Sequence, residues 1–377
     1  MKIVHVIIDL DIGGAELALQ RLIEAEKENL AVQHSVVSLT SLGKVGQHLQ
    51  SIGIHVHALG LRGILDIPSV VLQLFLLLRS ERPDIVQTWM YHADLLGGLT
   101  ARLAGMRNVV WGIRATDVDS RGSRATAVVR VICSFLSHFL PRTIVCVAQA
   151  ARESHISIGY DSAKMIVIPN GFDLSHLVAT NHQRLGLRNA CNFDNSLTVV
   201  GFLGRFHSDK DQLNFVRAAG LLAVNSRHVR FLMVGRELDS SNAQLMHWIR
   251  ETGFADHFVL LGERTDVPTC LSAMDIFCLS SRTEAFPNVV AEAMAMGIPC
   301  VVTDVGDAAL LVADTGVVVP KENSWALANG LGKMLAMSNE KRQLLGQTAK
   351  TRIQTEFSML RCTERFRVVY LNVISGI

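Results

Sequence analysis

Residues 275–305 read DIFCLSSRTEAFPNVVAEAMAMGIPCVVTDV, and they set out one strand–helix–strand unit. The apolar runs at the two ends, DIFCLS and CVVTDV, have the length and composition of buried strands. Pro287 suits the first helical position because its missing N–H costs nothing there, and Gly297 followed by Pro299 predicts the end of a helix over 287–296. The stretch therefore predicts two parallel strands joined by a helix.

The same pattern recurs along the chain. The segments between the apolar runs carry apolar residues at three- and four-residue spacing, which is typical of helices. Alternating strands and helices predict a parallel sheet covered by helices, and the pattern starts twice. Strands are expected at 2–8, 34–39, 54–59, 84–89, 108–113, 143–148 and 165–170, and then at 196–204, 229–235, 258–262, 275–280, 300–305 and 316–320.

A polar, irregular stretch at 173–195 separates the two sets of strands and is the best domain boundary. A chain of 377 residues is also longer than one hydrophobic core usually serves. The helical segment at the C-terminus is amphipathic and is expected to pack back on the first domain. We therefore expect an α/β protein of two Rossmann-like, doubly wound domains facing across a cleft, one formed by 1–170 with 357–377 and the other by 171–356.

Composition narrows the class of protein. A net charge of +2 argues against a dedicated nucleic-acid binder. The seven cysteines show no C-x-x-C pairing and mostly lie in apolar runs, which predicts buried thiols in a reducing cytoplasm, with neither disulfides nor a zinc site. The N-terminus lacks the layout of a signal peptide, and the longest apolar runs fall short of the roughly 20 residues of a transmembrane helix. The sequence therefore predicts a cytoplasmic protein.

Charge is not spread evenly. Between residues 100 and 152 stand eight arginines and only two aspartates, Asp117 and Asp119. Apolar helical segments at 70–78 and 127–140 lie nearby in the sequence. Such a region suits an anionic membrane surface or a diphosphate, and the plain alternative is a set of solvated arginines. Peripheral contact with the inner face of the cytoplasmic membrane is thus one expectation.

The loop before the predicted helix at 287–296 carries Glu284, and Glu292 follows inside the helix. The backbone N–H groups of Asn288, Val289 and Val290 are expected at the positive end of the helix dipole, which suits a phosphate. The two carboxylates would repel a phosphate but can accept hydrogen bonds from the hydroxyls of a sugar and a ribose. Together these groups indicate a nucleotide sugar. The alternatives are a solvent-facing glutamate at 292 and a dipole-stabilising charge at 284.

A second loop strengthens this interpretation. After the strand at 196–204, which ends in Gly204, come Arg205 and, five positions on, Lys210. Two cations from one loop can hold a diphosphate, the guanidinium as a fork and the ammonium as a point charge. The motif alone is weak evidence, but it lies at the same sheet edge as Glu284.

The order of these motifs resembles that of the family 4 retaining nucleotide-sugar glycosyltransferases with the GT-B fold. The resemblance spans essentially the whole chain, and its most specific part is the combination of E-x7-E with G-R-x4-K. The segments that carry it are GGAE (13–16), VIPNGFD (167–173), GRFHSDKD (204–211), VGRE (234–237), FVLLGERTDVP (258–268) and EAFPNVVAE (284–292).

The resemblance implies roles for these residues. Arg205 and Lys210 would hold the diphosphate, Glu284 would contact the transferred sugar, and Glu292 would take the ribose. It implies no metal and no cofactor, since the nucleotide sugar is a substrate, and it implies retention by attack on the same face. The implied donor-binding set is Gly13, Gly14, Gly204, Gly262, Arg264, Phe286, Pro287, Asn288, Val289 and Glu292, and the implied catalytic set is Arg205, Lys210 and Glu284.

One departure from the family pattern concerns the first domain. Many relatives place a histidine after the fifth strand, where this chain has Arg114. His92, after the fourth strand, is a second candidate, and either residue could bind the acceptor or the sugar, while a structural role is the alternative for His92. The expected reaction transfers a hexose, in first place from a UDP-sugar, to a saccharide or lipid-linked acceptor in cell-surface glycan synthesis.

Three other functions remain open. The triplets Asp9–Asp11 and Asp117–Asp119 could form the metal site of a GT-A transferase, although the duplicated sheet argues against it. A dehydrogenase is disfavoured because DIGGAE lacks G-x-G-x-x-G. A non-catalytic nucleotide-sugar-binding protein would need the same pocket, so only activity separates it from a transferase.

Overall fold

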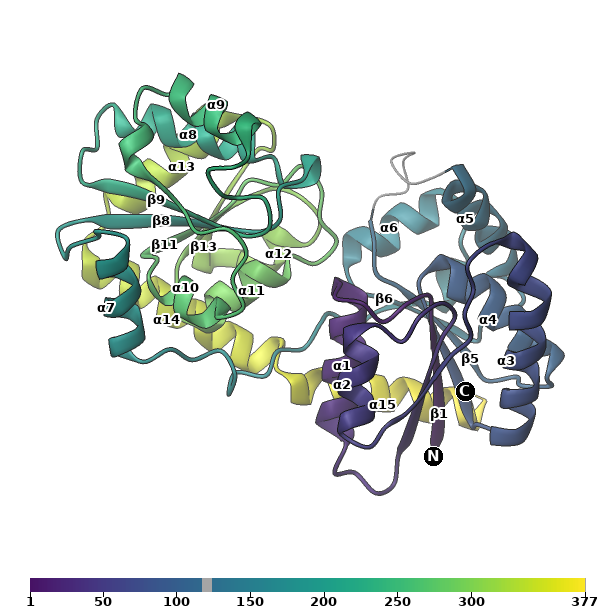
Figure 1. Ribbon diagram of the computed structural model, residues 1–377. Coiled ribbons are helices and arrows are strands. Elements are labelled where there is room, and N and C mark those ends of the chain that lie inside the picture. Colours follow the sequence, from purple (N-terminus) through teal and green to yellow (C-terminus); the bar gives the residue numbers. More distant parts are fainter. Residues whose placement is uncertain (117–123, 377) are drawn as a thin grey trace. The chain divides into compact units, whose positions relative to one another are not determined.

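The computed structural model describes residues 1–116 and 124–376. Asp117 and Asp119 therefore lie outside the described residues. The chain divides into two compact units, which we call unit 1 (Met1–Gly171 with Met359–Ile377) and unit 2 (Phe172–Ser358). Each unit is a parallel sheet with helices on both faces, as the alternation of strands and helices predicted (Figure 1).

Unit 1 contains a seven-stranded sheet in the order β3-β2-β1-β4-β5-β6-β7. All its strands pair in parallel. The strands are β1 Lys2–Ile7, β2 Gln33–Ser38, β3 His55–Ala58, β4 Ile85–Trp89, β5 Val109–Ile113, β6 Thr143–Cys146 and β7 Met165–Val167, and the helices are α1 Gly14–Glu26, α2 Gly43–Ser51, α3 Ile67–Glu81, α4 Tyr91–Leu103, α5 Arg124–Leu136, α6 Gln149–Ser157 and α15 Met359–Ser375.

Unit 2 contains a six-stranded parallel sheet in the order β10-β9-β8-β11-β12-β13. The strands are β8 Thr198–Leu203, β9 Val229–Val234, β10 Phe258–Leu260, β11 Ile276–Leu279, β12 Cys300–Thr303 and β13 Gly316–Val319. The helices are α7 Asn181–Ala190, α8 Gln212–Ala223, α9 Ala243–Glu251, α10 Val267–Ser272, α11 Asn288–Ala295, α12 Ala308–Val312, α13 Ser324–Leu335 and α14 Asn339–Glu356. Every predicted strand is present in one of the two sheets.

Burial explains why the strands read as near-continuous apolar runs. Every residue of β4 and of β5 is buried, including Trp89 and Trp111, because helices cover both faces of the sheet. In each sheet the chain first adds strands on one side of the first strand and then on the other. Such a reversal leaves a crevice at the carboxyl ends of the two central strands, which are β1 and β4 in unit 1 and β8 and β11 in unit 2.

The C-terminal helix α15 packs within unit 1. The hydroxyl of Tyr370 donates a hydrogen bond to the side-chain oxygen of Gln87 in β4, and Arg142 Nη1 donates to the carbonyl of Val373 at 3.1 Å. The Sγ of Cys362 lies 3.5 Å from the carbonyl of Pro169. These contacts join the end of the chain to the sheet that its beginning forms.

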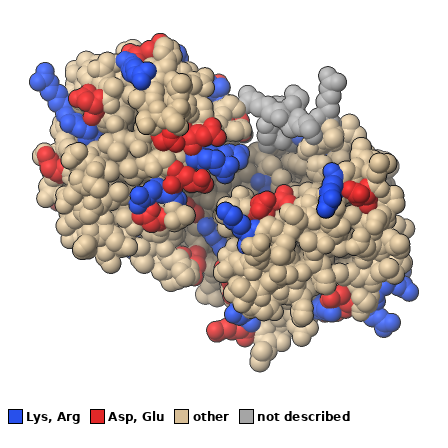
Figure 2. Space-filling view, viewed as in Figure 1, with Lys and Arg blue, Asp and Glu red and all other residues tan. Residues whose placement is uncertain are grey.

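Two further features bear on the class of protein. All seven cysteines are buried and unpaired, as their apolar surroundings predicted. In the part of the chain that the structure describes, no helix is both long and apolar enough to cross a membrane. Charged side chains of both signs are interspersed over the face in view, with wide uncharged areas between them, in keeping with the small net charge (Figure 2).

Candidate functional site

Two loops of unit 2 meet at the carboxyl ends of β8 and β11. After β8 the chain passes Gly204 and Arg205, makes a single 3₁₀ turn at Ser208–Lys210 and enters α8. After β11 it passes Glu284 and enters α11. Because β8 and β11 are neighbours, the predicted phosphate-binding loop and the predicted sugar-binding loop lie side by side.

The centre of this arrangement is an ion pair between the two loops. Lys210 Nζ lies 2.6 Å from Glu284 Oε1, and the side chains are 24% and 11% exposed. The hydroxyl of Ser281 donates to the same carboxylate oxygen at 2.8 Å. The sequence assigned Lys210 and Glu284 to different parts of a ligand, whereas the structure joins them directly. A substrate that reached Lys210 would therefore also reach Glu284.

Further contacts fix the β8 loop from the β11 side. The backbone N–H of Arg282 donates to the carbonyl of Asp209 at 2.7 Å, and Arg282 Nε lies 2.9 Å from Asp211 Oδ2. The hydroxyl of Ser280 donates to the carbonyl of Lys210 at 2.9 Å. Asp211 is buried, has a φ of 47° and accepts from the N–H of Asn214, so it caps α8. The sequence interpretation missed Arg282 and Asp211, although an aspartate before a helix is a recognisable capping signal.

Two glycines allow the loops to approach one another closely. Gly306, after β12, has a φ of 53°, and a Cβ there would lie 2.3 Å from the carbonyl oxygen of Glu284. Gly235, after β9, would place a Cβ 2.0 Å from the carbonyl oxygen of Gly204. Gly204 itself meets nothing closer than 3.6 Å. The close backbone contact at the β8 loop is therefore made by Gly235, which follows the neighbouring strand β9.

The side chain of Phe286 anchors the β11 loop. It is 7% exposed, and its ring stacks on that of Phe172, with centroids 6.2 Å apart, and lies 5.6 Å from that of Phe357. The side chain is thus committed to the interior of unit 2. The family resemblance implies that the backbone of Phe286 contacts the donor sugar, which the burial of the side chain leaves possible.

The start of α11 differs from the prediction by one residue. Pro287 precedes the helix as its N-cap, with φ −78° and ψ 88°, and Asn288 is the first helical residue. The N–H of Val290 donates to the carbonyl of Pro287 at 3.0 Å, so Val290 does not offer the ligand a free donor as expected. Asn288, Val289 and Glu292 are partly exposed and lie on one side of the helix.

Arg205 and Arg264 differ in how they are held. Arg205 is exposed, and its carbonyl accepts from Gln212 Nε2 at 2.8 Å, which fixes the backbone and leaves the side chain at the surface.

Arg264 makes a two-pronged contact with Asp266, at 2.8 and 2.7 Å, and these hydrogen bonds lower the pKa of Asp266. Gly262, with a φ of 64°, accepts at its carbonyl from the N–H of Gly235 at 2.8 Å. All of these loops lie at the carboxyl edge of the same sheet.

The glycines predicted for unit 1 lie at the start of α1. Gly13 is the N-cap residue, with a φ of −150°, and Gly14 begins the helix. A Cβ on Gly13 would lie 2.3 Å from a carboxylate oxygen of Glu16, whereas one on Gly14 would meet no atom within 4 Å. Burial raises the pKa of Glu16, and the carboxylates of Asp9 and Asp11 raise it further. The loop is therefore acidic as well as rich in glycine.

The two unit 1 candidates for the acceptor or the sugar occupy different surroundings. Arg114 Nη1 donates to Asn170 Oδ1 at 3.0 Å, and its guanidinium lies 4.4 Å from the ring centroid of Trp89. Burial of this guanidinium lowers the pKa of Arg114 to about 10. His92, in the first turn of α4, is partly exposed, and partial burial lowers its pKa, which favours the neutral imidazole. Arg114 thus already has partners inside unit 1, while His92 reaches the surface.

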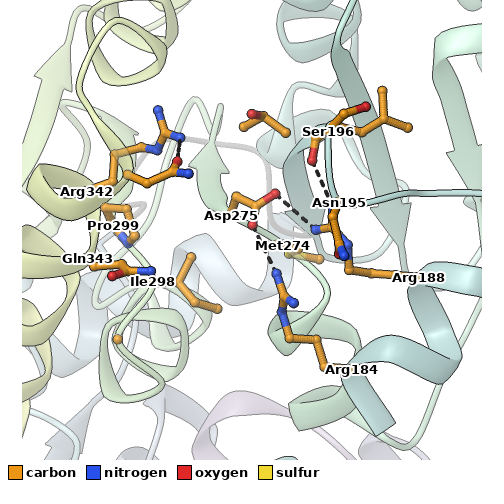
Figure 3. Close-up of a pocket in the computed structure, with 14 residues that line it drawn as sticks. Arg184, Arg188, Asn195, Ser196, Met274, Asp275, Ile298, Pro299, Arg342 and Gln343 are labelled. Atoms are coloured by element: carbon orange, nitrogen blue, oxygen red, sulfur yellow. Dashed lines mark hydrogen bonds and ion pairs between the residues drawn. The ribbon is translucent and has the colours of Figure 1, made fainter. Parts of the chain in front are cut away.

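A cavity of about 320 Å³ lies at the opposite, amino-terminal edge of the unit 2 sheet (Figure 3). Three of its four charged groups contact one another, since Arg184 and Arg188 lie 3.3 and 3.0 Å from the carboxylate of Asp275. Asp275 also accepts from the N–H of Val199 at 2.8 Å. This network ties α7 to the sheet, so we assign the cavity a structural role.

Comparisons with known proteins agree with this geometry. A family model described as Glycosyltransferase Family 4 matches residues 12–176, and one described as Glycosyl transferases group 1 matches residues 198–337. An Escherichia coli protein, UDP-Gal:alpha-D-GlcNAc-diphosphoundecaprenol alpha-1,3-galactosyltransferase, is 24% identical over 82% of this chain and 81% of its own. The Staphylococcus aureus capsular polysaccharide biosynthesis glycosyltransferase CapM is 21% identical over 81% of this chain and 80% of its own.

The fold is also shared with solved structures. The crystal structure of Anabaena Alr3699/HepE in complex with UDP and glucose superposes with a TM-score of 0.83, at 22% identity and 98% coverage of both chains. One family model thus covers most of unit 1, and the other covers most of unit 2. The chain therefore belongs to the family 4 (group 1) glycosyltransferases with the GT-B fold.

Proposed function

We propose that the protein transfers a hexose from a nucleotide diphosphate, in first place from a UDP-sugar, to a saccharide or lipid-linked acceptor in the synthesis of a cell-surface glycan. The observation that carries this proposal is the Lys210–Glu284 pair at the carboxyl edge of the unit 2 sheet, with Arg205 in the same loop as Lys210. The E. coli and S. aureus relatives bear names of this kind, and the Anabaena protein was crystallised with UDP and glucose.

The proposed chemistry is transfer without a metal or a cofactor. The bond between the anomeric carbon and the diphosphate oxygen breaks, and negative charge develops on the diphosphate. Arg205, Lys210 and the N-terminal turn of α11 stabilise that charge, which is the main catalytic contribution. The acceptor hydroxyl attacks from the same face and gives its proton to the departing phosphate, so the configuration is retained. No protein nucleophile is needed.

In this scheme Glu284 has two roles, one in the free protein and one when the donor is bound. In the free protein its carboxylate holds the ammonium of Lys210 at 2.6 Å. We propose that the diphosphate takes over part of this contact when the donor binds, and that the carboxylate then accepts hydrogen bonds from the sugar hydroxyls. Glu292, one turn into α11, is proposed to accept from the ribose, and His92 is proposed to contact the acceptor or the sugar.

A screen of nucleotide sugars tests the proposal. UDP-glucose, UDP-galactose, UDP-N-acetylglucosamine and GDP-mannose are incubated with the protein in the presence of a chelator, and release of the nucleotide is measured. We expect turnover of at least one UDP-sugar that persists with the chelator and yields the retained anomer. Activity that requires Mg²⁺ or Mn²⁺ would contradict the proposed metal-independent transfer. Tight binding of UDP without turnover of any donor would favour a non-catalytic binding protein.

The face of α5 supports contact with a membrane. Val128, Val131, Ile132 and Phe135 are 59%, 65%, 41% and 68% exposed, and their spacing places them on one side of the helix. Phe139 continues this stripe beyond the helix end, with its ring 5.5 Å from that of Phe135. A contiguous apolar surface of this kind is uncommon on a soluble monomer and suits the interface of a bilayer.

Cations flank the end of the same stripe. Arg102 Nη2 donates to the carbonyl of Phe139 at 3.2 Å, and Lys164 Nζ donates to that of His138 at 2.6 Å. Four other arginines of the basic region are held by the fold: Arg130 is buried, and Arg114, Arg142 and Arg152 donate hydrogen bonds to Asn170, Val373 and Met165. The proposed membrane contact at the inner face of the cytoplasmic membrane therefore rests on the apolar stripe and a few cations, not on the whole arginine excess.

Co-sedimentation with vesicles tests this contact. Phosphatidylglycerol vesicles at low salt are expected to bind the protein, and phosphatidylcholine vesicles to bind it less. The variant Val131→Ser/Phe135→Ser should lose most of this binding, while Leu310→Ser, which changes an exposed leucine in unit 2, should not. Equal binding by both variants, or none by the unaltered protein, would remove the membrane from the proposal.

A further inference from the structure

A second cavity, of about 620 Å³, forms a groove over the outer side of α8 in unit 2. Leu213, Arg217 and Leu221 of α8 contribute to it. One wall comes from α9 and the residue after it, and the other from the loop before α13 and its first turn, which together supply Trp248, Glu251, Thr252, Glu322, Asn323, Ser324 and Trp325. None of these residues belongs to the candidate donor site.

The groove carries two tryptophans of the four in the chain. Trp325 is 74% exposed in the first turn of α13, and Trp248 is partly exposed on α9. Side chains of this size are normally placed in the interior, and an indole held at the surface is typical of a binding site. Because the other two tryptophans are buried in unit 1, exposed indole in the described residues is found only at this groove.

The charges of the groove indicate what it binds. Arg217 is the one cation of the lining, and Glu251 and Glu322 supply two carboxylates, of which that of Glu322 also lies 3.3 Å from Arg282 Nε. With one cation in its lining, the groove offers a phosphate or an acidic glycan little counter-charge. A neutral sugar meets complementary groups, because its C–H faces pack on indole rings and its hydroxyls donate to carboxylates and accept from a guanidinium.

We propose that this groove is a second carbohydrate site, which holds a neutral glycan chain apart from the donor site. The choice of a saccharide as the ligand rests on the proposed function, because a glycosyltransferase handles a growing chain. The cavity is large enough for a ligand of a few sugar units, since typical ligand pockets span roughly 300–1,000 Å³. Such a site would keep the chain near the enzyme between transfers.

The groove is linked to the donor loops by two contacts. The ring of Trp248 lies 5.6 Å from that of Phe206, the residue after Arg205. Glu322 lies 3.3 Å from Arg282 Nε, and the same nitrogen lies 2.9 Å from Asp211, next to Lys210. Trp248 and Glu322 therefore support the donor loops as well as line the groove. Among the described contacts, Trp325 makes none to the donor loops, so Trp325 is the residue to substitute.

Affinity electrophoresis in native gels tests the site. The gels contain dextran, galactan or mannan, all neutral polysaccharides, and the mobility of the full chain is compared with that in a gel without polysaccharide. We expect at least one of them to retard the protein, and Trp325→Ala to weaken that retardation about fivefold or more. Leu344→Ala, which removes an exposed apolar side chain from α14, is the matched control and should behave as the unaltered chain.

Two further measurements separate this site from the donor site. The variant Lys210→Ala should keep its retardation, and saturating UDP should not abolish it, because the groove and the Lys210–Glu284 pair are different places on unit 2. The proposal is overturned if no polysaccharide retards the protein, if Trp325→Ala and Leu344→Ala behave alike, or if UDP displaces the saccharide. These results do not depend on turnover, so a failed donor screen would not produce them.

Discussion

Lys210 Nζ contacts Glu284 Oε1 at 2.6 Å across 74 residues of sequence, and it thereby joins the β8 loop to the β11 loop. Lys210→Ala removes both the ammonium that faces the diphosphate and the partner of a mostly buried carboxylate. We expect kcat for the UDP-sugar to fall about 10²-fold or more. The free energy of unfolding should fall by about 1.5–3 kcal/mol, because a charged hydrogen bond is lost.

A double variant separates the two effects. Adding Glu284→Gln to Lys210→Ala removes the charge of the carboxylate that faced Lys210, so part of the stability measured by urea unfolding should recover while activity does not. Arg205→Ala should also lower kcat by orders of magnitude, whereas Glu153→Ala, which changes an exposed glutamate on α6, should do little. Equal kinetic effects from Arg205→Ala, Lys210→Ala and Glu153→Ala would contradict the assignment of the site.

Gly306 controls the position of Glu284 through the backbone. Its φ is 53°, and a Cβ would lie 2.3 Å from the carbonyl oxygen of Glu284. Gly306→Ala should therefore move the β11 loop, lower the free energy of unfolding by about 1–3 kcal/mol and lower kcat/KM. The matched control is Gly186→Ala in α7, where a Cβ meets no atom within 4 Å, and it should stabilise the protein by about 0.5–1 kcal/mol. Both variants are measured by thermal unfolding and donor turnover. If Gly306→Ala left the stability and kcat/KM unchanged, the β11 loop would be able to move without affecting Glu284.

Phe286 holds the same loop through its ring. Its ring stacks on Phe172 and contacts Phe357 in a tilted arrangement, directly before Pro287 and Asn288 in the chain. Phe286→Ala should cost about 3–5 kcal/mol in the free energy of unfolding. Phe286→Leu keeps much of the volume and should retain more stability, with a rise in KM for the donor because the turn is less firmly placed. If both variants kept the unaltered KM, the ring would have no part in shaping the site.

Much of this architecture follows from local patterns. The central strands were recognisable because burial on both faces makes a strand apolar throughout, as in β4 and β5. The sequence also placed Lys210 and Glu284 at the same sheet edge, because each follows a predicted strand of one sheet. Their direct contact did not follow, because a side-chain pairing between two loops depends on tertiary geometry. The same holds for Arg282, whose partner Asp211 lies in the other loop. The shift of the helix start from Pro287 to Asn288 reflects the one-residue uncertainty of helix ends.

Asp94 gives unit 1 a specific dependence on pH. This carboxyl is fully buried on α4, the hydroxyl of Thr88 donates to its Oδ1 at 2.5 Å, and burial raises its pKa to about 8. An unfolded aspartate has a pKa of about 3.9, so between that value and about pH 8 the unfolded chain ionises while the folded one keeps its proton. The contribution of Asp94 to the free energy of unfolding should therefore be greatest below about pH 4. This contribution should fall as the pH rises towards 8.

Asp94→Asn removes this contribution, because an amide of nearly the same shape does not titrate. Urea unfolding at pH 5 and pH 7.5 should show that the unaltered protein loses more stability over this interval than the variant does. The difference in slope is expected to reach up to about 1.4 kcal/mol per pH unit. Thr88→Val should lower the stability of the protein without removing the pH dependence, because the buried carboxyl remains. Parallel pH profiles for the unaltered protein and Asp94→Asn would mean that Asp94 is already ionised in the folded state at neutral pH.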